Sequence, residues 1–312
     1  MTAWSSKRTT LIALKIAFSI GLIAFLLWRI PFARVAGALG AADPRWLGAA
    51  AAVMLASNLL GTYQWWRLLR VANIRLPLWK TCAYYHVGLF FNNFLPANIG
   101  GDIARVADSS RHGGTTGAAV SAVVMDRLIG TVALAGVALV TTFPAVDRFH
   151  LLLAYLCLVG FFALSVALLW GLFHPRLLPA MERVLARVGL GRLSPHLDEL
   201  ALRLEAYRGA RALLARMLVV AAITQLARIG VHALVARALG LRVPFQYFLL
   251  FVPLLAVIVS FGLIGVDRAR AFSLQFLTYL VAVTVSLLGG LAYLIRIPQR
   301  RAAARSLGRD AG

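Results

Sequence analysis

The sequence predicts an all-α, polytopic membrane protein: a helix bundle with six spanning helices and two re-entrant segments. Hydrophobic residues make up 61% of the 312 positions and charged residues only 14%, whereas soluble domains are nearer half apolar and a quarter charged. Apolar runs of about 20 residues, the length that crosses a bilayer as a helix, recur along most of the chain. Basic clusters separate these runs. We therefore expect one transmembrane domain over residues 1–312.

Six apolar runs are long enough to span a membrane. They lie near 11–29, 46–69, 117–142, 151–173, 213–239 and 271–295. The first follows Lys7 and Arg8, which gives it the polarity of a signal peptide. Its apolar run is too long for a signal peptide and no small-residue cleavage site follows closely, so we expect it to stay as the first span.

Two further apolar stretches, 82–101 and 245–265, contain residues that break helices. The first contains Asn92, Asn93, Pro96, Asn98, Gly100 and Gly101, and the second contains Pro253, Gly262 and Gly265. Proline removes a backbone donor and glycine weakens a helix. Irregular backbone at membrane depth is tolerated only inside protein or beside a water-filled cavity. We therefore predict that both stretches are re-entrant.

The distribution of basic residues predicts the topology, because cytoplasmic loops carry an excess of Lys and Arg. Two re-entrant segments place both termini in the cytoplasm, together with an amphipathic connector at 174–212 and a basic tail at 296–312. If 245–265 crossed fully, the chain would have seven spans and the basic tail would be outside. Two broken segments in corresponding places of two halves also indicate an inverted repeat with a binding site at the midplane.

Composition and motifs argue against several functions. The net charge of +21 arises from short clusters between apolar runs, which fits anionic headgroups at a cell (inner) membrane better than nucleic acid. Cys82 and Cys157 lie far apart, and no P-loop, HExxH, GxSxG or paired-carboxylate motif occurs. We therefore expect no metal, no cofactor and no enzymatic activity.

Polar and flexible residues gather within 91–105. The amides of Gly100 and Gly101 could face an anion with Arg105 close by, as a phosphate-bearing headgroup requires. Asp102 and Arg105 are three residues apart, so on a helix they share a face and can pair. The simpler reading is that the motif only shapes a turn between helices.

Charged residues also fall inside predicted spans. Asp126 and Arg127 stand about ten residues into the third span, where lipid exposure is costly. Adjacent residues point about 100° apart on a helix, so we expect one of them to meet Arg105 or Asp102 while the other lines a cavity. In the fifth span, Arg228 and His232 share one face, with Gln225 one turn earlier. This row is a candidate headgroup or proton path, although a lone histidine is more often structural.

Aromatic residues near the ends of these segments predict membrane anchoring. Trp65, Trp66, Trp79, Tyr84 and Tyr85 are interpreted as interfacial anchors, because tryptophan and tyrosine favour the headgroup region.

The pattern Asn92, Pro96, Gly100, Gly101, Asp102 and Arg105 resembles the signature of the lysylphosphatidylglycerol synthase transmembrane region family, whose flippase-like stand-alone members include hopanoid-associated proteins. Asp126-Arg127 stands where the family commonly has Glu-Arg. The second family motif is degenerate here: Gly262, Gly265, Asp267 and Arg268 keep two glycines and a charged pair, but the preceding proline is absent and the acid comes before the base.

The resemblance implies binding and translocation, between leaflets, of an amphipathic phospho- or isoprenoid-type lipid with an anionic or zwitterionic headgroup. It also implies headgroup binding by the residues of both motifs. The chain ends at Gly312, which leaves no room for the aminoacyl-transferase domain of the two-domain synthases, so lysyl transfer is not expected.

Two alternatives stay open from the sequence. One is a polytopic transferase acting on a lipid-linked sugar, with Asp102 or Asp126 as its catalytic carboxylate. The other is a non-transporting scaffold of a lipid-biosynthetic complex. The partners we expect are membrane lipids, together with a second copy of the chain or lipid-biosynthetic enzymes, and no nucleic acid.

Overall fold

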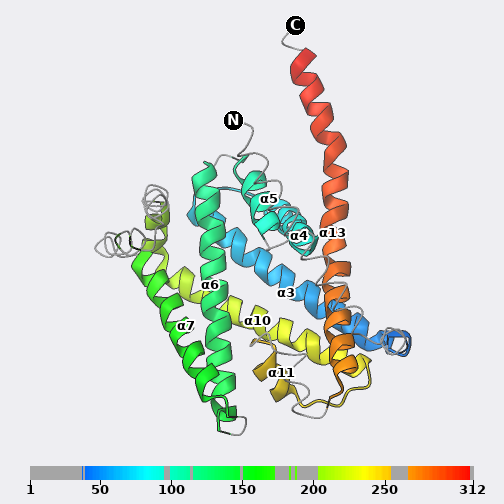
Figure 1. Ribbon diagram of the computed structural model, residues 1–312. Coiled ribbons are helices and arrows are strands. Elements are labelled where there is room, and N and C mark those ends of the chain that lie inside the picture. The colour runs from blue at the N-terminus through cyan, green and yellow to red at the C-terminus, as the bar shows by residue number, and fades with distance from the viewer. Residues whose placement is uncertain are drawn as a thin grey trace, which may run out of the picture.

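The computed structural model describes residues 37, 39–94, 99–112, 115–147, 150–172, 183, 187, 203–253 and 266–309, with the backbone alone at 94, 99, 172, 268 and 294–309. Over these residues the chain forms eight α-helices and no strand (Figure 1). The helices are α3 (Pro44–Val71), α4 (Leu78–Phe94), α5 (Ile99–Ser109), α6 (Thr116–Thr142), α7 (Leu152–Leu172), α10 (Arg211–Ala238), α11 (Phe245–Phe251) and α13 (Arg268–Arg309). Two short 3-10 helices, Phe143–Ala145 and Glu205–Ala210, adjoin α6 and α10.

Five helical segments are long and apolar enough to cross a membrane. They are Pro44–Val71, Thr116–Ala145, Leu152–Gly171, Glu205–Ala238 and Ala269–Tyr293. They correspond to five of the six predicted spans, because a run of about 20 apolar residues can satisfy its backbone in lipid only as a helix. The predicted first span, 11–29, lies outside the described residues. The chain is therefore an all-helical, multi-pass membrane protein.

The centre of the bundle is an antiparallel pair, α3 and α10, which lie side by side along their lengths (Figure 1). At one end the N–H of Asp43 donates to the carbonyl of Ala238 at 2.9 Å. At the other end the hydroxyl of Tyr207 donates to the carbonyl of Leu68 at 3.0 Å. We call the end at which α3 finishes the basic end, because Arg67, Arg70, Arg75, Lys80 and Arg111 all follow or flank helix termini there.

Helices α4 and α5 form an antiparallel hairpin that starts and finishes at the basic end. The rings of Tyr84 and His112 lie 5.7 Å apart at its open end, and Asn92 reaches Gly101 near its tip. Residues 95–98, which include Pro96, lie outside the described residues. The described arms α4 and α5 therefore lie against each other as a hairpin, and neither is among the five helical segments long and apolar enough to span a membrane.

The tip of the hairpin lies near the middle of the bundle. The hydroxyl of Tyr279 donates to the carbonyl of Asn93 at 2.9 Å, and the Asn93 amide donates to Ser286 Oγ at 2.9 Å. Tyr279 and Ser286 are 11 and 18 residues into α13, so the contacts lie roughly 17–27 Å along that helix. The described residues next to the hairpin tip therefore pack against the interior of the apolar segment Ala269–Tyr293, and not against its ends.

The second broken segment begins with the short helix α11. Residues 254–265 lie outside the described residues, including Gly262 and Gly265. Leu241, before the segment, and Val266, after it, pack in the same apolar cluster with the start of α13. The described residues on either side of the segment therefore lie close together, at the end of the bundle opposite the basic end. Whether 245–265 is re-entrant stays a prediction, because most of it lies outside the described residues.

The contacts of the two halves are reciprocal. The first hairpin packs on α13 through α4, while α11 packs on α6. Each of the central helices α3 and α10 contacts both α6 and α13. A side chain of α6, Thr141, donates to the carbonyl of Leu249 in α11 at 2.9 Å, as Tyr279 of α13 does to the first hairpin. This pairing has the pattern that an inverted repeat produces.

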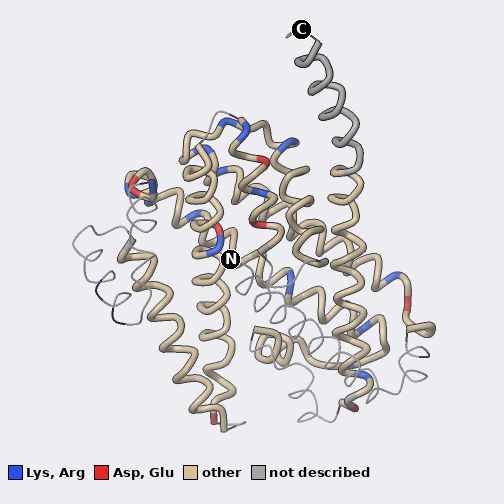
Figure 2. The backbone as a smooth tube through the Cα atoms, turned by 45° about the horizontal axis from the view of Figure 1, so that its top comes forward, with Lys and Arg blue, Asp and Glu red and all other residues tan. Residues whose placement is uncertain are grey.

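Charged positions occur within the bundle as well as at its ends (Figure 2), whereas α7 carries none and is largely exposed. Of the predicted connector at 174–212, the described part from residue 203 packs on the bundle, where Leu204 and Tyr207 are fully buried. Helix α13 continues without a break through the predicted tail and projects beyond the bundle (Figure 1).

Candidate functional site

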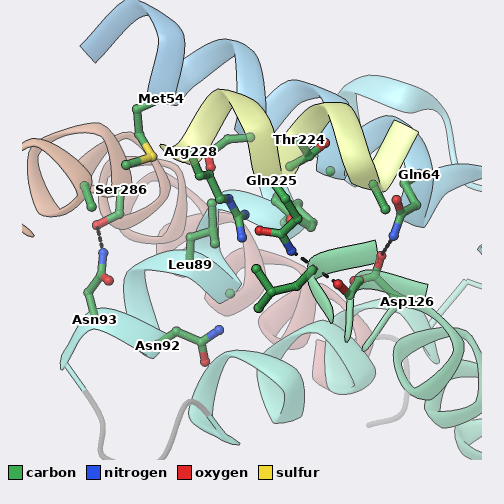
Figure 3. A pocket seen from close by; sticks show the side chains of 18 of the residues that line it. Met54, Gln64, Leu89, Asn92, Asn93, Asp126, Thr224, Gln225, Arg228 and Ser286 are labelled. Atoms are coloured by element: carbon green, nitrogen blue, oxygen red, sulfur yellow. Dashed lines mark hydrogen bonds between the residues drawn. The ribbon is translucent and has the colours of Figure 1, made fainter. Parts of the chain in front are cut away.

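A cavity of about 620 Å³ lies in the middle of the bundle, between the α4–α5 hairpin and helices α3, α6, α10 and α13. Its volume is within the range of small-ligand sites. Figure 3 shows Arg228 and Gln225 extending from α10 into this space, with Asn92 and Asn93 on α4 and Asp126 on α6 around it. Six helices thus contribute polar side chains to one space at membrane depth.

The lining residues repeat at helical spacing on each span. Besides the polar residues of the hairpin and the pair Asp126 and Arg127, the polar members are Asn58 and Gln64 on α3, Thr131 on α6, Thr224, Gln225, Arg228 and His232 on α10, and Gln275, Thr278, Tyr279 and Ser286 on α13. Residues three and four apart share a helix face, so α10 and α13 each present a polar stripe to the cavity. Of this set, sequence reasoning singled out only Arg228 and His232, with Gln225 beside them. The signal that could have found the others is the recurrence of polar residues every three or four positions within apolar spans.

Four charged side chains form a continuous network of ion pairs on the hairpin side of the cavity. Arg105 donates to Asp102 at 2.6 Å and to Asp126 at 2.8 Å. Arg127 donates to both oxygens of Asp102 at 2.9 Å through Nε and Nη2, and Gln64 donates to Asp126 at 2.8 Å. The predicted Asp102–Arg105 pair is confirmed, and so is the meeting of Asp126 with Arg105. The network holds two cations and two anions, so its own charges cancel.

Arg105 is the most enclosed member of the network, with 5% of its side chain exposed. Its guanidinium carbon lies 5.2 Å from the Trp65 ring centroid and 5.4 Å from that of Tyr85, distances at which cation–π attraction operates. Trp65 is fully buried and Tyr85 is 7% exposed. The prediction that these two aromatics are interfacial anchors is therefore wrong, because they enclose a buried cation instead. Trp79, by contrast, is 69% exposed.

The glycines of the hairpin serve close packing. The N–H of Gly101 donates to the Asn92 side-chain oxygen at 2.8 Å. A Cβ at Gly101 would collide with the carbonyl oxygen of Gly88 and with Asn92. The expectation that the Gly101 amide faces an anion is wrong, because Asn92 already accepts from it. Asn92 instead supplies the internal partner that a broken helix needs. Gly100 lies beside Gly101 and is partly buried, while Asn98 lies outside the described residues.

The polar row on α10 faces the cavity as predicted. Gln225 donates to the carbonyl of Gly130 on α6 at 3.3 Å. His232 Nδ1 is 3.0 Å from the carbonyl of Arg228, so that ring nitrogen is the donor and His232 is fixed to its own helix. Among the described residues, none forms a hydrogen bond or an ion pair with the Arg228 guanidinium. Arg228 is thus the cation of the cavity that lacks a protein partner within the described part of the chain.

The described part of the second motif lies away from the cavity. Asp267 is exposed and its carboxylate accepts from the N–H of Ala269 at 3.1 Å, which is the geometry of an N-cap. Arg268 is the first residue of α13. The structure therefore places Asp267 at a helix start and does not bring it together with the residues of the first motif.

Comparison with known proteins identifies a family for this architecture. The family model described as lysylphosphatidylglycerol synthase TM region matches residues 12–266, which includes the hairpin, the charged network and the polar row on α10. No curated protein and no solved structure matches the chain. Because the family model covers most of the sequence, the chain belongs to the lysylphosphatidylglycerol synthase transmembrane region family.

Proposed function

We propose that this protein binds an amphipathic lipid with an anionic group, of the phospho- or isoprenoid type, and moves it between the leaflets of the cell membrane. The observation that carries the proposal is Arg228, a cation that faces a polar cavity at membrane depth without a partner among the described residues. Intramembrane ionisable residues pair with one another or mark substrate paths. A phosphate or carboxylate of a ligand is the partner that this guanidinium lacks.

The balance of charge in the cavity supports an anionic ligand. Arg105, Arg127, Asp102 and Asp126 neutralise one another, so Arg228 leaves one unit of positive charge. Arginine binds phosphate and carboxylate through a planar fork of donors. Gln225 and Thr224 line the same cavity and offer further polar contacts. A neutral or cationic headgroup would leave this charge uncompensated.

The arrangement of the two halves supports translocation. Transporters built from inverted repeats hold their substrates near the midplane, beside broken helices, and expose the site to each side in turn by rocking one half against the other. The α4–α5 hairpin tip lies at that depth, and the contacts of α3, α6, α10, α11 and α13 are reciprocal. The excess of Lys and Arg at the basic end supports a cytoplasmic location for that end.

The transferase alternative has weaker support than transport. Its catalytic carboxylate would be Asp102 or Asp126, and both already accept charge-assisted hydrogen bonds from Arg105. A substrate that contacted either carboxylate would have to displace part of this charged network. The scaffold alternative predicts that Arg105→Ala leaves the lipid phenotype untouched.

The test is the lipid that remains with the purified protein, measured by mass spectrometry on wild type and variants. We expect Arg228→Ala to lower the retained anionic lipid at least about tenfold, because a charged hydrogen bond contributes about 1.5–3 kcal/mol. Arg228→Lys should retain an intermediate amount, since it keeps the charge and loses the fork.

The matched control is Arg216→Ala, which removes an exposed arginine from the same helix, α10. It should leave the retained lipid unchanged. Equal lipid loss in Arg216→Ala and Arg228→Ala would contradict the proposal, because it would show that general surface charge, and not the cavity, holds the lipid.

A further inference from the structure

A second hollow lies on the outer side of the hairpin, in the groove between α5 and α6. It has a volume of about 740 Å³. Its floor is apolar and consists mainly of Val106 and Ala107 on α5 and Val120, Val123 and Val124 on α6. Together with Asp102, Ile103 and Ser110 on the α5 side and Thr116, Arg127 and Leu128 on the α6 side, they recur every three or four positions, so the groove follows one face of α5 and one face of α6.

The groove has a charged group at each of its ends. Arg111 lies at the basic end of the bundle, where α5 finishes, with Ser110 and Thr116 beside it. Arg111 is exposed, and none of the described residues pairs with it. At the inner end, Arg127 and Asp102 form their ion pair. From Thr116 to Leu128 the groove follows 12 residues of α6, which is roughly 18 Å and slightly more than half of the hydrocarbon thickness of about 30 Å.

These dimensions match one half of a bilayer. An apolar channel one leaflet deep, with a free cation at its outer rim, is complementary to a phospholipid that stands upright in that leaflet. Its acyl chain would replace water or loose lipid along the valines, and its phosphate would reach Arg111. Burying an acyl methylene contributes to binding free energy mainly when the methylene would otherwise be in water. In a membrane the acyl chain is already surrounded by lipid, so burial in the groove adds little. The charge of Arg111 at the rim therefore decides which lipid binds.

Arg127 connects this groove with the central cavity. It lines both spaces, and 49% of its side chain is exposed. Its partner Asp102 lies at the inner end of the groove, on the first turn of α5. The Arg127–Asp102 pair thus stands between a lipid in the groove and the polar site that contains Arg228.

We infer that the α5–α6 groove is the site at which an anionic phospholipid of the leaflet at the basic end docks before transport, with one acyl chain along the valines and its phosphate at Arg111. The inference rests on the proposed function, for which it supplies the route of the lipid to the cavity. Arg127 is the residue that such a lipid meets on leaving the groove.

Photo-crosslinking of the full-length protein tests the inference. The protein is placed in phosphatidylcholine vesicles that contain phosphatidylglycerol with a diazirine in its acyl chain, and labelled residues are located by mass spectrometry. We expect more labelling on residues 103–124 than on α7. Arg111→Ala should lower this labelling about fivefold, the effect of one basic residue near a membrane surface. Ala107→Trp, which fills the groove, should abolish it.

The matched control for the filled groove is Ala163→Trp, which adds the same side chain to an exposed position of α7 and should leave labelling of 103–124 unchanged. Equal labelling by a diazirine phosphatidylcholine would overturn the inference, as would persistence of labelling in Ala107→Trp. Arg228→Ala should keep the labelling, since it acts in the cavity. Labelling without lipid translocation by wild type would therefore reject the proposed function alone, and translocation without labelling would reject the groove alone.

Discussion

Replacing Arg105 by alanine should lower the free energy of unfolding by about 3–5 kcal/mol, the cost of removing one partner from a buried ion pair. Arg105 donates to both Asp102 and Asp126, and Trp65 and Tyr85 cover its guanidinium. Without it, the network retains two carboxylates and the single cation Arg127. Asp126 is 10% exposed, so water cannot replace the lost donor well.

Reversible unfolding in mixed detergent micelles measures this free energy. A double variant, Arg105→Met with Asp126→Leu, removes one cation and one anion together and leaves the Asp102–Arg127 pair. It should be more stable than Arg105→Ala, because a buried ion pair can be replaced by apolar residues at little cost. If the double variant is as unstable as the sum of its single changes, the charge-balance explanation is wrong.

Gly101→Ala should destabilise the protein by at least about 1–3 kcal/mol, the usual effect of forcing an extra carbon into a packed interior. The new Cβ would collide with the carbonyl oxygen of Gly88, which is backbone and cannot rotate away, and with the Asn92 side chain. The two helices of the hairpin would have to separate. The hydrogen bond from the Gly101 N–H to Asn92 would then lengthen or break.

Gly230→Ala on α10 is the matched control, since a Cβ there would meet nothing within 4 Å. Alanine favours a helix over glycine by about 0.5–1 kcal/mol, so this variant should be neutral or more stable in the same unfolding measurement. A stability loss of equal size at both positions would contradict the role assigned to close packing at Gly101.

Sequence reasoning predicts the described spans well because lipid imposes a simple condition. A run of apolar residues at membrane depth must be helical, and the five described segments carry this signal strongly. The hairpin is predictable for the complementary reason, since Asn92, Pro96 and Gly101 cannot belong to a straight span facing lipid. Positive charge favours the six-span topology over the seven-span one, and this stays a prediction because residues 11–29 and 254–265 lie outside the described residues.

The composition of the cavity was predicted less completely, because it depends on how distant spans face one another. Gln64 and Asp126 are 62 residues apart in sequence, and Gln64 Nε2 donates to Asp126 Oδ1 at 2.8 Å. No local sequence pattern predicts such a contact. Trp65 and Tyr85 are of the residue types that favour the membrane interface, but here they are buried and pack on the guanidinium of Arg105. Likewise, the Gly101 amide is used by Asn92, which only the folded hairpin reveals.

Leaflet-resolved lipid movement in liposomes tests the central claim most directly. Reconstituted wild-type protein should move fluorescent phosphatidylglycerol between leaflets faster than the lipid moves in protein-free vesicles. The Arg228→Ala variant should move it at least about tenfold more slowly than wild type, because one charged contact is lost. The Arg216→Ala variant should match wild type. Movement in wild-type vesicles no faster than in protein-free vesicles, or unchanged by Arg228→Ala, would contradict the account.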